Sequence, residues 1–220
     1  MDVSDLIKSP EYVNETLVYK SNDKTLDILH MNHLFDKSET ENIVIDLLNN
    51  ERIIYGDKNA FYRLSSGSKN KGWCKKWTPM MNFVRHRVAD YLNAHNIYIH
   101  PEKYPIPNNL IVNFCSPNES YTLVSRTKDM REIGGDNEYI IVIVSLCDCY
   151  DVYFNRKTEV QDDINKFKLP DGMMDGDVLV IKGLTCVNWK KHVPKSNNSW
   201  WGLTFRFVRK LDRPEYIPYY

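Results

Sequence analysis

Apolar residues recur at helical spacing in two segments of the first half of the chain. The first segment opens at Ser38, which forms a capping-box pair with Glu41. The second has Thr78 as a suitable N-cap, followed by a proline at the first helical position. We therefore expect helices over 38–50 and 79–94. The buried stripe expected on the second helix consists of Met80, Phe83, Val84, Val88, Tyr91 and Leu92.

From residue 108 onward the pattern changes to short apolar runs separated by Gly, Pro, Asp and Asn, which is typical of strands. The run YIIVIVSL is apolar on both faces, so we expect that strand to lie between two layers. In the last strand, Phe205 and Phe207 alternate with Thr204 and Arg206, so Arg206 should point away from the aromatic side chains. The predicted strands cover 110–114, 139–146, 150–154, 178–181 and 203–208, with shorter strand-like patches at 17–19 and 26–29.

Helices followed by closely spaced strands predict an α+β domain, whose strands form a sandwich or barrel with the helices backing one sheet. A chain of 220 residues is long enough for one domain with a sizeable core, so we treat 1–220 as a single domain. Within it, 1–50 form an N-terminal extension and the first helix, 51–210 the core, and 211–220 an aromatic tail.

Composition narrows the class of protein. Hydrophobic residues make up 42% of the chain, which excludes wholesale disorder. No apolar run approaches a membrane span, the N-terminus lacks the layout of a signal peptide, and the cysteine count of 5 is odd and irregularly spaced. We therefore expect an intracellular protein of the cytoplasm or nucleus with no membrane partner. Asparagine occurs 21 times and alanine only 3 times, a bias that suggests an AT-rich, viral source.

One group of side chains suggests a metal site. Cys147, Cys149, Cys186 and His192 could supply four zinc ligands, but zinc ligand pairs are usually separated by two or more residues within a turn. Alternating strand positions favour buried thiols instead, so we predict no metal there.

Two local basic stretches are interleaved with aromatic residues, although the net charge is zero. Cations that neutralise phosphates beside rings that stack on bases are the chemistry of single-stranded nucleic-acid binding. A solvated loop with anchoring tryptophans is the alternative. The first stretch contains Lys69, Lys71, Trp73, Lys75, Lys76, Trp77 and Arg85, and the second contains Trp189, Lys190, Lys191 and Lys195.

The order of several short motifs resembles that of the AlkB-type iron and 2-oxoglutarate dioxygenases, which remove methyl groups from nucleic-acid bases. The similarity covers roughly 51–210 and implies a double-stranded β-helix, a jelly-roll-like core, with two N-terminal helices backing one sheet. The matching segments are Tyr55-Gly56-Asp57, similar to a nucleotide-recognition loop, Trp77-x-Pro79, 109–120, 145–157, 175–183, His192-Val193-Pro194 and 202–206.

In that family a His-x-Asp pair and a distal histidine bind Fe(II). The resemblance implies that His192 is the distal histidine and that Val124 and Arg126 occupy the positions of the pair, where neither can bind iron. At the co-substrate site, Thr204 and Arg206 match the family.

The co-substrate motif Asn-x-Tyr reads Val112-x-Phe114 here, which removes an amide and a hydroxyl. The resemblance thus implies a catalytically inactive AlkB-like domain without a cofactor, serving as a scaffold for nucleic acid or a protein.

Two alternatives stay open. The first is an active dealkylase that uses Fe(II) and 2-oxoglutarate with altered ligands, such as His192 with Asp129. The second is a structural or host-interaction protein whose old pocket is filled by Val124, Phe114 and Trp200.

Overall fold

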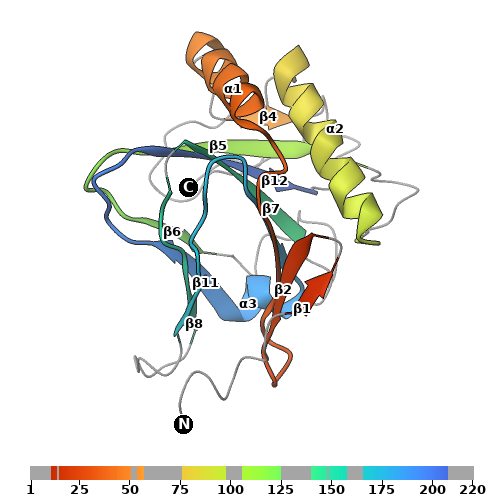
Figure 1. The fold of residues 1–220 in the computed structure, drawn as a ribbon, viewed down its shortest axis with the longest axis vertical. Helices are drawn as coiled ribbons and strands as arrows, with labels where there is room; N and C mark the ends of the chain where they lie inside the picture. The colour runs from red at the N-terminus through yellow and green to blue at the C-terminus, as the bar shows by residue number, and fades with distance from the viewer. Residues whose placement is uncertain are drawn as a thin grey trace, which may run out of the picture.

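Two antiparallel sheets lie face to face, and helices α1 and α2 cover the outer face of the larger sheet (Figure 1). The structure is a computed structural model that describes residues 11–13, 15–50, 54–56, 76–97, 106–124, 140–147, 149–157 and 166–207. The helices are α1 (Lys37–Asn50), α2 (Pro79–Ala94) and the short α3 (Leu184–Asn188). Among the described helices, none is long and apolar enough to span a membrane.

The larger sheet has eight strands in the order β1-β2-β3-β10-β7-β12-β5-β4, and the smaller has four in the order β6-β11-β8-β9. The strands of the larger sheet are β1 (Glu11–Val13), β2 (Thr16–Lys20), β3 (Asp27–Met31), β4 (Ile54–Gly56), β5 (Asn109–Cys115), β7 (Ile140–Cys147), β10 (Val178–Lys182) and β12 (Trp200–Arg206). Those of the smaller sheet are β6 (Tyr121–Val124), β8 (Tyr153–Arg156), β9 (Lys166–Lys168) and β11 (Trp189–Val193).

From β5 onward the chain crosses repeatedly between the two sheets. Strands β5 to β8 alternate between the larger and the smaller sheet, and so do β9 to β12. The four strands β10-β7-β12-β5 therefore face β6-β11-β8-β9, which is a jelly-roll-like arrangement. The predicted β-sandwich is confirmed at this level. Strands β1 to β3 extend the larger sheet, because β3 pairs with β10.

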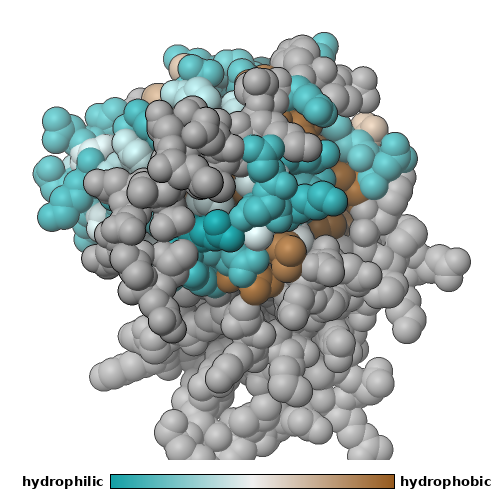
Figure 2. Space-filling view, turned by 90° about the horizontal axis from the view of Figure 1, so that it is seen from below, coloured by the Kyte–Doolittle hydropathy of each residue, from teal (hydrophilic) through white to brown (hydrophobic). Residues whose placement is uncertain are grey.

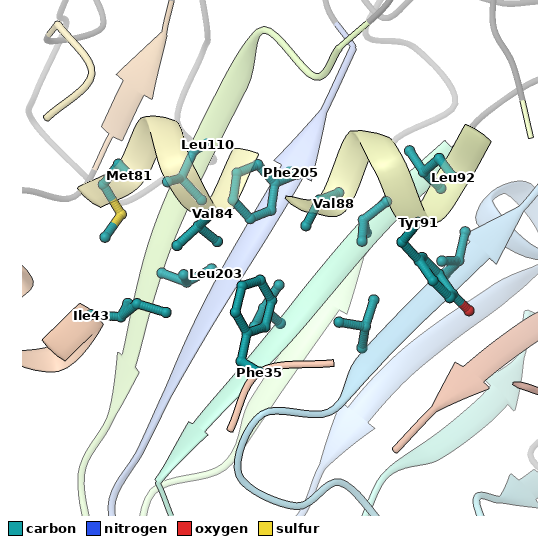
Figure 3. Packing of buried hydrophobic residues seen from close by; sticks show 14 of the residues in the cluster. Phe35, Ile43, Met81, Val84, Val88, Tyr91, Leu92, Leu110, Leu203 and Phe205 are labelled. Carbon is teal, nitrogen blue, oxygen red and sulfur yellow. The ribbon is translucent and has the colours of Figure 1, made fainter. Parts of the chain in front are cut away.

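The larger sheet is apolar on both faces because each face is covered. Along β7, Val142 and Val144 pack under the helices, whereas Ile141 and Ile143 pack between the sheets. The expectation that this strand lies between two layers is confirmed. Figure 3 shows the helix side, where apolar side chains of α2 lie over Leu203 and Phe205 of β12.

Both helices form where the spacing predicts them, but the expected cap of α1 is wrong. Its N-cap is Asp36 and not Ser38: the Glu39 amide donates to Asp36 Oδ1 and the Asp36 amide donates to Glu39 Oε2, each at 2.9 Å. Thr78 caps α2 as predicted, accepting from the Met81 amide at 3.0 Å.

The buried stripe of α2 is rotated from the predicted one. Met81 is fully buried, Met80 is half-buried, and Phe83 is 42% exposed. The rotation follows from the surroundings of the helix, since α2 packs both on the sheet and against α1.

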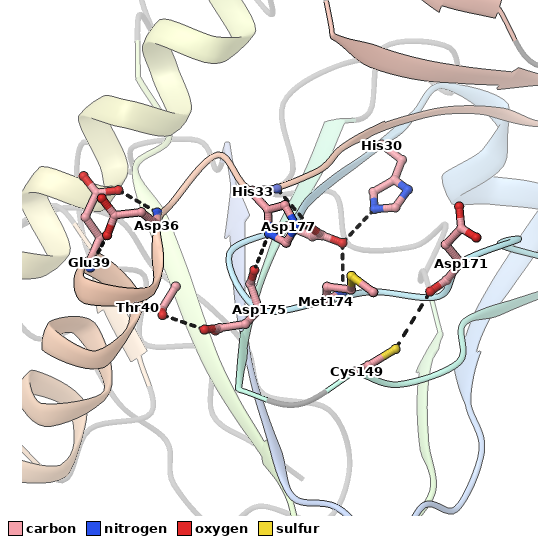
Figure 4. Close-up of polar contacts among 10 residues, drawn as sticks. All are labelled: His30, His33, Asp36, Glu39, Thr40, Cys149, Asp171, Met174, Asp175 and Asp177. Carbon is pink, nitrogen blue, oxygen red and sulfur yellow. Dashed lines mark hydrogen bonds and ion pairs between the residues drawn. The ribbon is translucent and has the colours of Figure 1, made fainter.

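A polar network joins the β3–α1 connection to the turn before β10 (Figure 4). The buried Asp177 carboxylate accepts from the His33 amide at 2.9 Å and the Met174 amide at 2.8 Å, and it lies 3.0 Å from His30 Nε2. Gly176 has a φ of +80°, and a Cβ there would lie 2.0 Å from the Phe35 carbonyl oxygen. The Asp-Gly-Asp motif at 175–177 is therefore explained by packing.

Phe205→Ala should lower the free energy of unfolding by about 3–5 kcal/mol, because it leaves a cavity beneath α2. Phe205 is fully buried and stacks on Trp77 with ring centroids 6.4 Å apart. Phe114→Ala is the matched control on the neighbouring strand, where the ring is 51% exposed, and should cost less than about 1 kcal/mol. Urea unfolding followed by circular dichroism measures both, and equal losses would contradict this account of the core.

Candidate functional site

Strand β11 turns alternate side chains into the space between the sheets. Trp189, Lys191 and Val193 are buried, whereas Lys190 is exposed and His192 is half-exposed. Lys191 lies opposite Phe154 of β8, which is 1% exposed and packs between the sheets. Cross-strand partners share a face, so Lys191 points inward and His192 points outward.

The outward direction of His192 departs from what the resemblance implies. Its Nδ1 is 2.9 Å from Thr122 Oγ1, a contact on the outer surface of the smaller sheet. A metal ligand of this fold would need to face the space between the sheets. Because side chains alternate along a strand, a difference of one residue in register reverses the face. The inner position at this point of β11 therefore belongs to Lys191.

Three aromatic rings surround the Lys191 ammonium group. Its Nζ lies 5.8 Å from the ring centroid of Tyr121, 5.6 Å from that of Tyr150 and 5.5 Å from that of Trp200. Trp200 stacks on Tyr150 with centroids 4.7 Å apart and meets Tyr121 edge-on at 5.5 Å. We call Tyr121, Tyr150 and Trp200 the aromatic cage.

The cage attracts a cation through the faces of its rings, but burial acts against the charge. Lys191 is 3% exposed, and within the described part of the chain no carboxylate pairs with it. Burial lowers the pKa of Lys191 from 10.5 to about 7, and the nearby Cys115 thiol opposes that change only weakly. Near neutral pH the site therefore holds an amine that is partly protonated.

Trp200 occupies space between the sheets that a side chain at residue 202 would otherwise need. A Cβ built on Gly202 would lie 2.9 Å from Trp200 Cζ3, so the indole lies directly over the glycine. Trp200 itself is 2% exposed. The indole, the Tyr150 ring and the lysine together fill this end of the interior.

The aligned co-substrate motif seemed to lack an amide and a hydroxyl. An amide lies one residue away, at Asn113, and a hydroxyl lies on strand β6, at Tyr121. Val112 packs on the helix side, and Phe114 is exposed and contacts Trp201 at a centroid distance of 4.7 Å. One alternative expected Phe114 to fill the interior, and its exposed position shows that it does not.

Asn113 instead faces inward. Its Nδ2 donates to Thr204 Oγ1 at 3.0 Å, and its Oδ1 accepts from the Tyr121 hydroxyl at 3.2 Å. A one-residue shift in the alignment of β5 would have found this amide in the sequence.

Thr204 and Arg206 both point between the sheets, as the alternation along β12 predicts. They are 3% and 7% exposed, on the face opposite Phe205. Arg206 pairs in register with Asn109 and Ile141, at the other end of β12 from Trp200. The two positions are about 20 Å apart along the strand, so Arg206 and the caged lysine do not form one site.

Trp77 and Arg85 of the first basic stretch contact each other. The Arg85 guanidinium lies 4.4 Å from the centroid of the Trp77 ring, and that ring stacks on Phe205. Trp77 thus anchors α2 to the sheet, while Lys76 is exposed.

Of the remaining predicted residues, two are placed only by their position in a strand, and the others lie outside the described part of the chain. Val124 ends β6 and pairs with Lys190 in register, and Tyr55 lies in β4. The predicted residues outside the described part of the chain are Asp57, Lys69, Lys71, Trp73, Lys75, Arg126 and Asp129.

The side chains between the sheets do not fit Fe(II). Iron in this fold needs a facial set of imidazole and carboxylate ligands, whereas the inward position of β11 presents the Lys191 amine, surrounded by two phenols, an indole and the Cys115 thiol. Among the described residues, no group of three His, Cys, Asp or Glu side chains is placed to hold a metal ion. Cys186 is buried and Cys149 is exposed, so they do not form the zinc group considered from the sequence.

A second feature is a groove of about 770 Å³ beside α1. Ile45 of α1 and Met174 line it and are 55% and 42% exposed. Charged side chains surround them, and the remaining lining residues are His33, Lys37, Thr40, Glu41, Val44, Cys149 and Asp175.

No family model matches the chain, and no curated protein matches its sequence. Among solved structures, a prolyl-4-hydroxylase from Pseudomonas putida matches with a TM-score of 0.50 and 8% sequence identity, over 84% of this chain and 88% of that one. This chain therefore has a fold similar to that of the hydroxylase, with a jelly-roll-like β-sandwich at its core. At this identity the likeness concerns the fold alone.

Lys191→Met should remove the part of the pH dependence of stability that the buried amine causes between about pH 7 and 10. Because the pKa of Lys191 is lower in the folded than in the unfolded chain, the unfolded chain binds more protons in that window. The free energy of unfolding of the native protein should therefore rise with pH from 7 toward 10.5. The variant should be more stable than the native protein near pH 7 by on the order of 4 kcal/mol.

Denaturant unfolding at several pH values measures this difference, with Lys190→Met as the matched control. Lys190 is the exposed neighbour on the same strand, so its variant should keep the rise in stability with pH that Lys191 causes. If Lys191→Met kept that dependence too, the buried amine would not be its source.

Proposed function

We propose that this chain is a non-catalytic, AlkB-like double-stranded β-helix that serves as a binding scaffold for a macromolecule. One observation carries the proposal: the inward residue of β11 is Lys191, held in the aromatic cage where the family resemblance implies a metal-binding histidine. The oxygenase-like fold supports the scaffold, and the chemistry of the interior supports the loss of the reaction.

The caged amine opposes a metal ion in two ways. In its protonated form it places a positive charge beside any divalent cation, and this repulsion is strong where water is largely absent. Metal ligands must also be deprotonated, so binding would compete with the proton on Lys191. His192 is the one residue of the implied triad that this sequence retains, and it would need to face the opposite side of β11 to contribute.

The filled interior also opposes the co-substrate. A dicarboxylate needs space and several donors, whereas Trp200 lies over Gly202 and the Thr204 hydroxyl already accepts from Asn113. Arg206 and Thr204 retain the family's residue types in the interior, and here they belong to the packing between the sheets.

A partner of such a protein binds at the outer surface. On the face seen in Figure 2, the described residues are mainly hydrophilic, and the hydrophobic ones form small patches. Where that face is described, a partner meets polar and charged groups rather than a broad apolar surface. Nucleic acid and an acidic protein both suit such chemistry.

A thermal-shift titration with Mn(II) and 2-oxoglutarate tests the loss of the reaction site. Ligands that bind only the folded state raise the melting temperature, and we expect no saturable rise for this chain with either ligand or both. The Pseudomonas prolyl-4-hydroxylase, assayed in parallel, is the positive control. A joint saturable rise that Arg206→Ala abolished would contradict the proposal and favour an enzyme with altered ligands.

A further inference from the structure

Within the described part of the chain, the buried amine of Lys191 has no acceptor for its protons. The ring centroids of the aromatic cage lie between 5.5 and 5.8 Å from Nζ, and the Cys115 thiol is the other neighbour that affects its charge. None of the described ion pairs includes this amine. Buried polar groups in proteins are nearly always hydrogen-bonded, so an unpartnered buried amine points to a ligand.

Two hydroxyl groups at the same end of the interior also lack a partner. The Tyr150 and Ser145 hydroxyls are buried, and neither makes a hydrogen bond. Tyr150 stacks on Trp200, and Ser145 pairs with Gly202, over which the Trp200 indole lies. Burial raises the pKa of Tyr150, and the neighbouring Ser145 hydroxyl partly opposes that change. The two hydroxyls are therefore neighbours, although their geometry does not make a hydrogen bond.

The amine, the phenol and the alcohol all carry protons that they can donate. The rings around them are weak acceptors, so they do not replace a carbonyl or carboxylate oxygen. Leaving buried donors unpaired is costly, and the cost is removed when an acceptor binds among them. This end of the interior therefore suits a small group that carries oxygen atoms.

The burial of Lys191 also makes its amine reactive. An amine attacks an electrophile only in its unprotonated form, and desolvation favours that form. Burial lowers the pKa of Lys191 to about 7. At pH 7 about half of such amines are unprotonated, compared with roughly one in 3,000 at an ordinary lysine. A reagent for unprotonated amines would therefore distinguish Lys191 from the exposed lysines.

The reagent must be small and uncharged, because Lys191 is only 3% exposed. Carbon dioxide meets both conditions, and its adduct with an amine carries two oxygen acceptors. An aldehyde would form an imine, which offers the two hydroxyls no oxygen. A free inorganic anion would lose its hydration on entering these apolar layers, at a high cost in free energy.

We propose that Lys191 is a carbon dioxide site, at which the amine forms a carbamate that the Ser145 and Tyr150 hydroxyls hold. The nitrogen lone pair forms a bond to carbon, and one C=O π pair moves onto oxygen. The nitrogen then releases one proton to the buffer, so the amine and carbon dioxide give a carbamate anion and a proton. No oxidant or reductant takes part. The inference goes beyond the proposed function, because it assigns a covalent modification that neither a scaffold nor a lost reaction requires.

Carbon-13 NMR of the protein in labelled bicarbonate at pH 7.5 tests the proposal. The native protein should show a carbamate resonance that Lys191→Met lacks. Lys190→Met is the matched control, since Lys190 is exposed on the same strand, and it should keep the resonance. Carbamates on other amines are common to all three proteins and do not affect the comparison.

Variants of the two hydroxyls test how the carbamate is held, and they leave the amine in place if Lys191→Met does not fold. Ser145→Ala and Tyr150→Phe should each weaken the affinity for carbon dioxide about tenfold or more, because each removes a hydrogen bond to a charged group. Tyr153→Phe makes the same change on the outer surface of the smaller sheet and should alter the affinity less than twofold. Circular dichroism and urea midpoints show whether each variant folds.

Melting temperature gives a second measurement. Replacing chloride by bicarbonate at constant pH and ionic strength should raise the melting temperature of the native protein by about 2 °C or more, since the carbamate forms in the folded state alone. In the unfolded chain the lysine is protonated at pH 7.5 and does not react. Lys190→Met should show the same rise, and Lys191→Met should show none.

Three results would overturn the proposal. They are equal carbamate signals in the native protein and Lys191→Met, an affinity for carbon dioxide that Ser145→Ala and Tyr150→Phe both leave unchanged, and a native melting temperature that bicarbonate does not raise. The Mn(II) and 2-oxoglutarate titration is run without bicarbonate. A rise there would contradict only the proposed function, so the two failures are distinguishable.

Discussion

The alternation of side chains along each strand is the constraint on which the structure depends. In a sandwich with helices on one side, every central position faces either the helices, the space between the sheets or solvent. Strand β7 is apolar throughout because both of its faces are covered. Strand β11 has one covered face. Because its side chains alternate between the two faces, Lys191 is enclosed and His192 faces solvent. A shift of one residue would exchange those two environments.

The same alternation explains why the alignment with the AlkB-type motifs fails on two separate strands. On β5, Val112 and Phe114 were aligned with co-substrate residues, but the interior position between them is Asn113. On β11, His192 was aligned with a metal ligand, but the interior position is Lys191. The alignment was based on matching residue types in sequence order. The direction of a side chain depends instead on its cross-strand partners. Those partners lie far away in the sequence, as Lys191 and Phe154 do.

Local patterns were sufficient where they were long and strongly periodic. Both helices, the doubly covered strand β7 and the inward direction of Arg206 follow from spacing alone. The strands β6, β9 and β11 were missed because they have five residues or fewer and polar residues interrupt the apolar ones, so no long apolar run marks them in the sequence. The aromatic cage could not be predicted, since Tyr121, Tyr150 and Trp200 meet only through the tertiary fold. The cap at Asp36 could have been predicted, because Asp36 and Glu39 have the same capping-box spacing as Ser38 and Glu41, two residues earlier in the chain.

Adjacent lysines on β11 show how one strand can separate two roles. Lys191 is buried among rings, where its charge is costly and its partners are fixed, whereas Lys190 is exposed among other cations, where its charge remains available. The buried Lys191 opposes a metal ion in the interior, whereas the exposed Lys190 contributes positive charge to the outer face. Because apolar layers hold the two sheets together, the fold does not depend on the residues of a reaction site, and the side chains at such a site can differ while the scaffold stays the same.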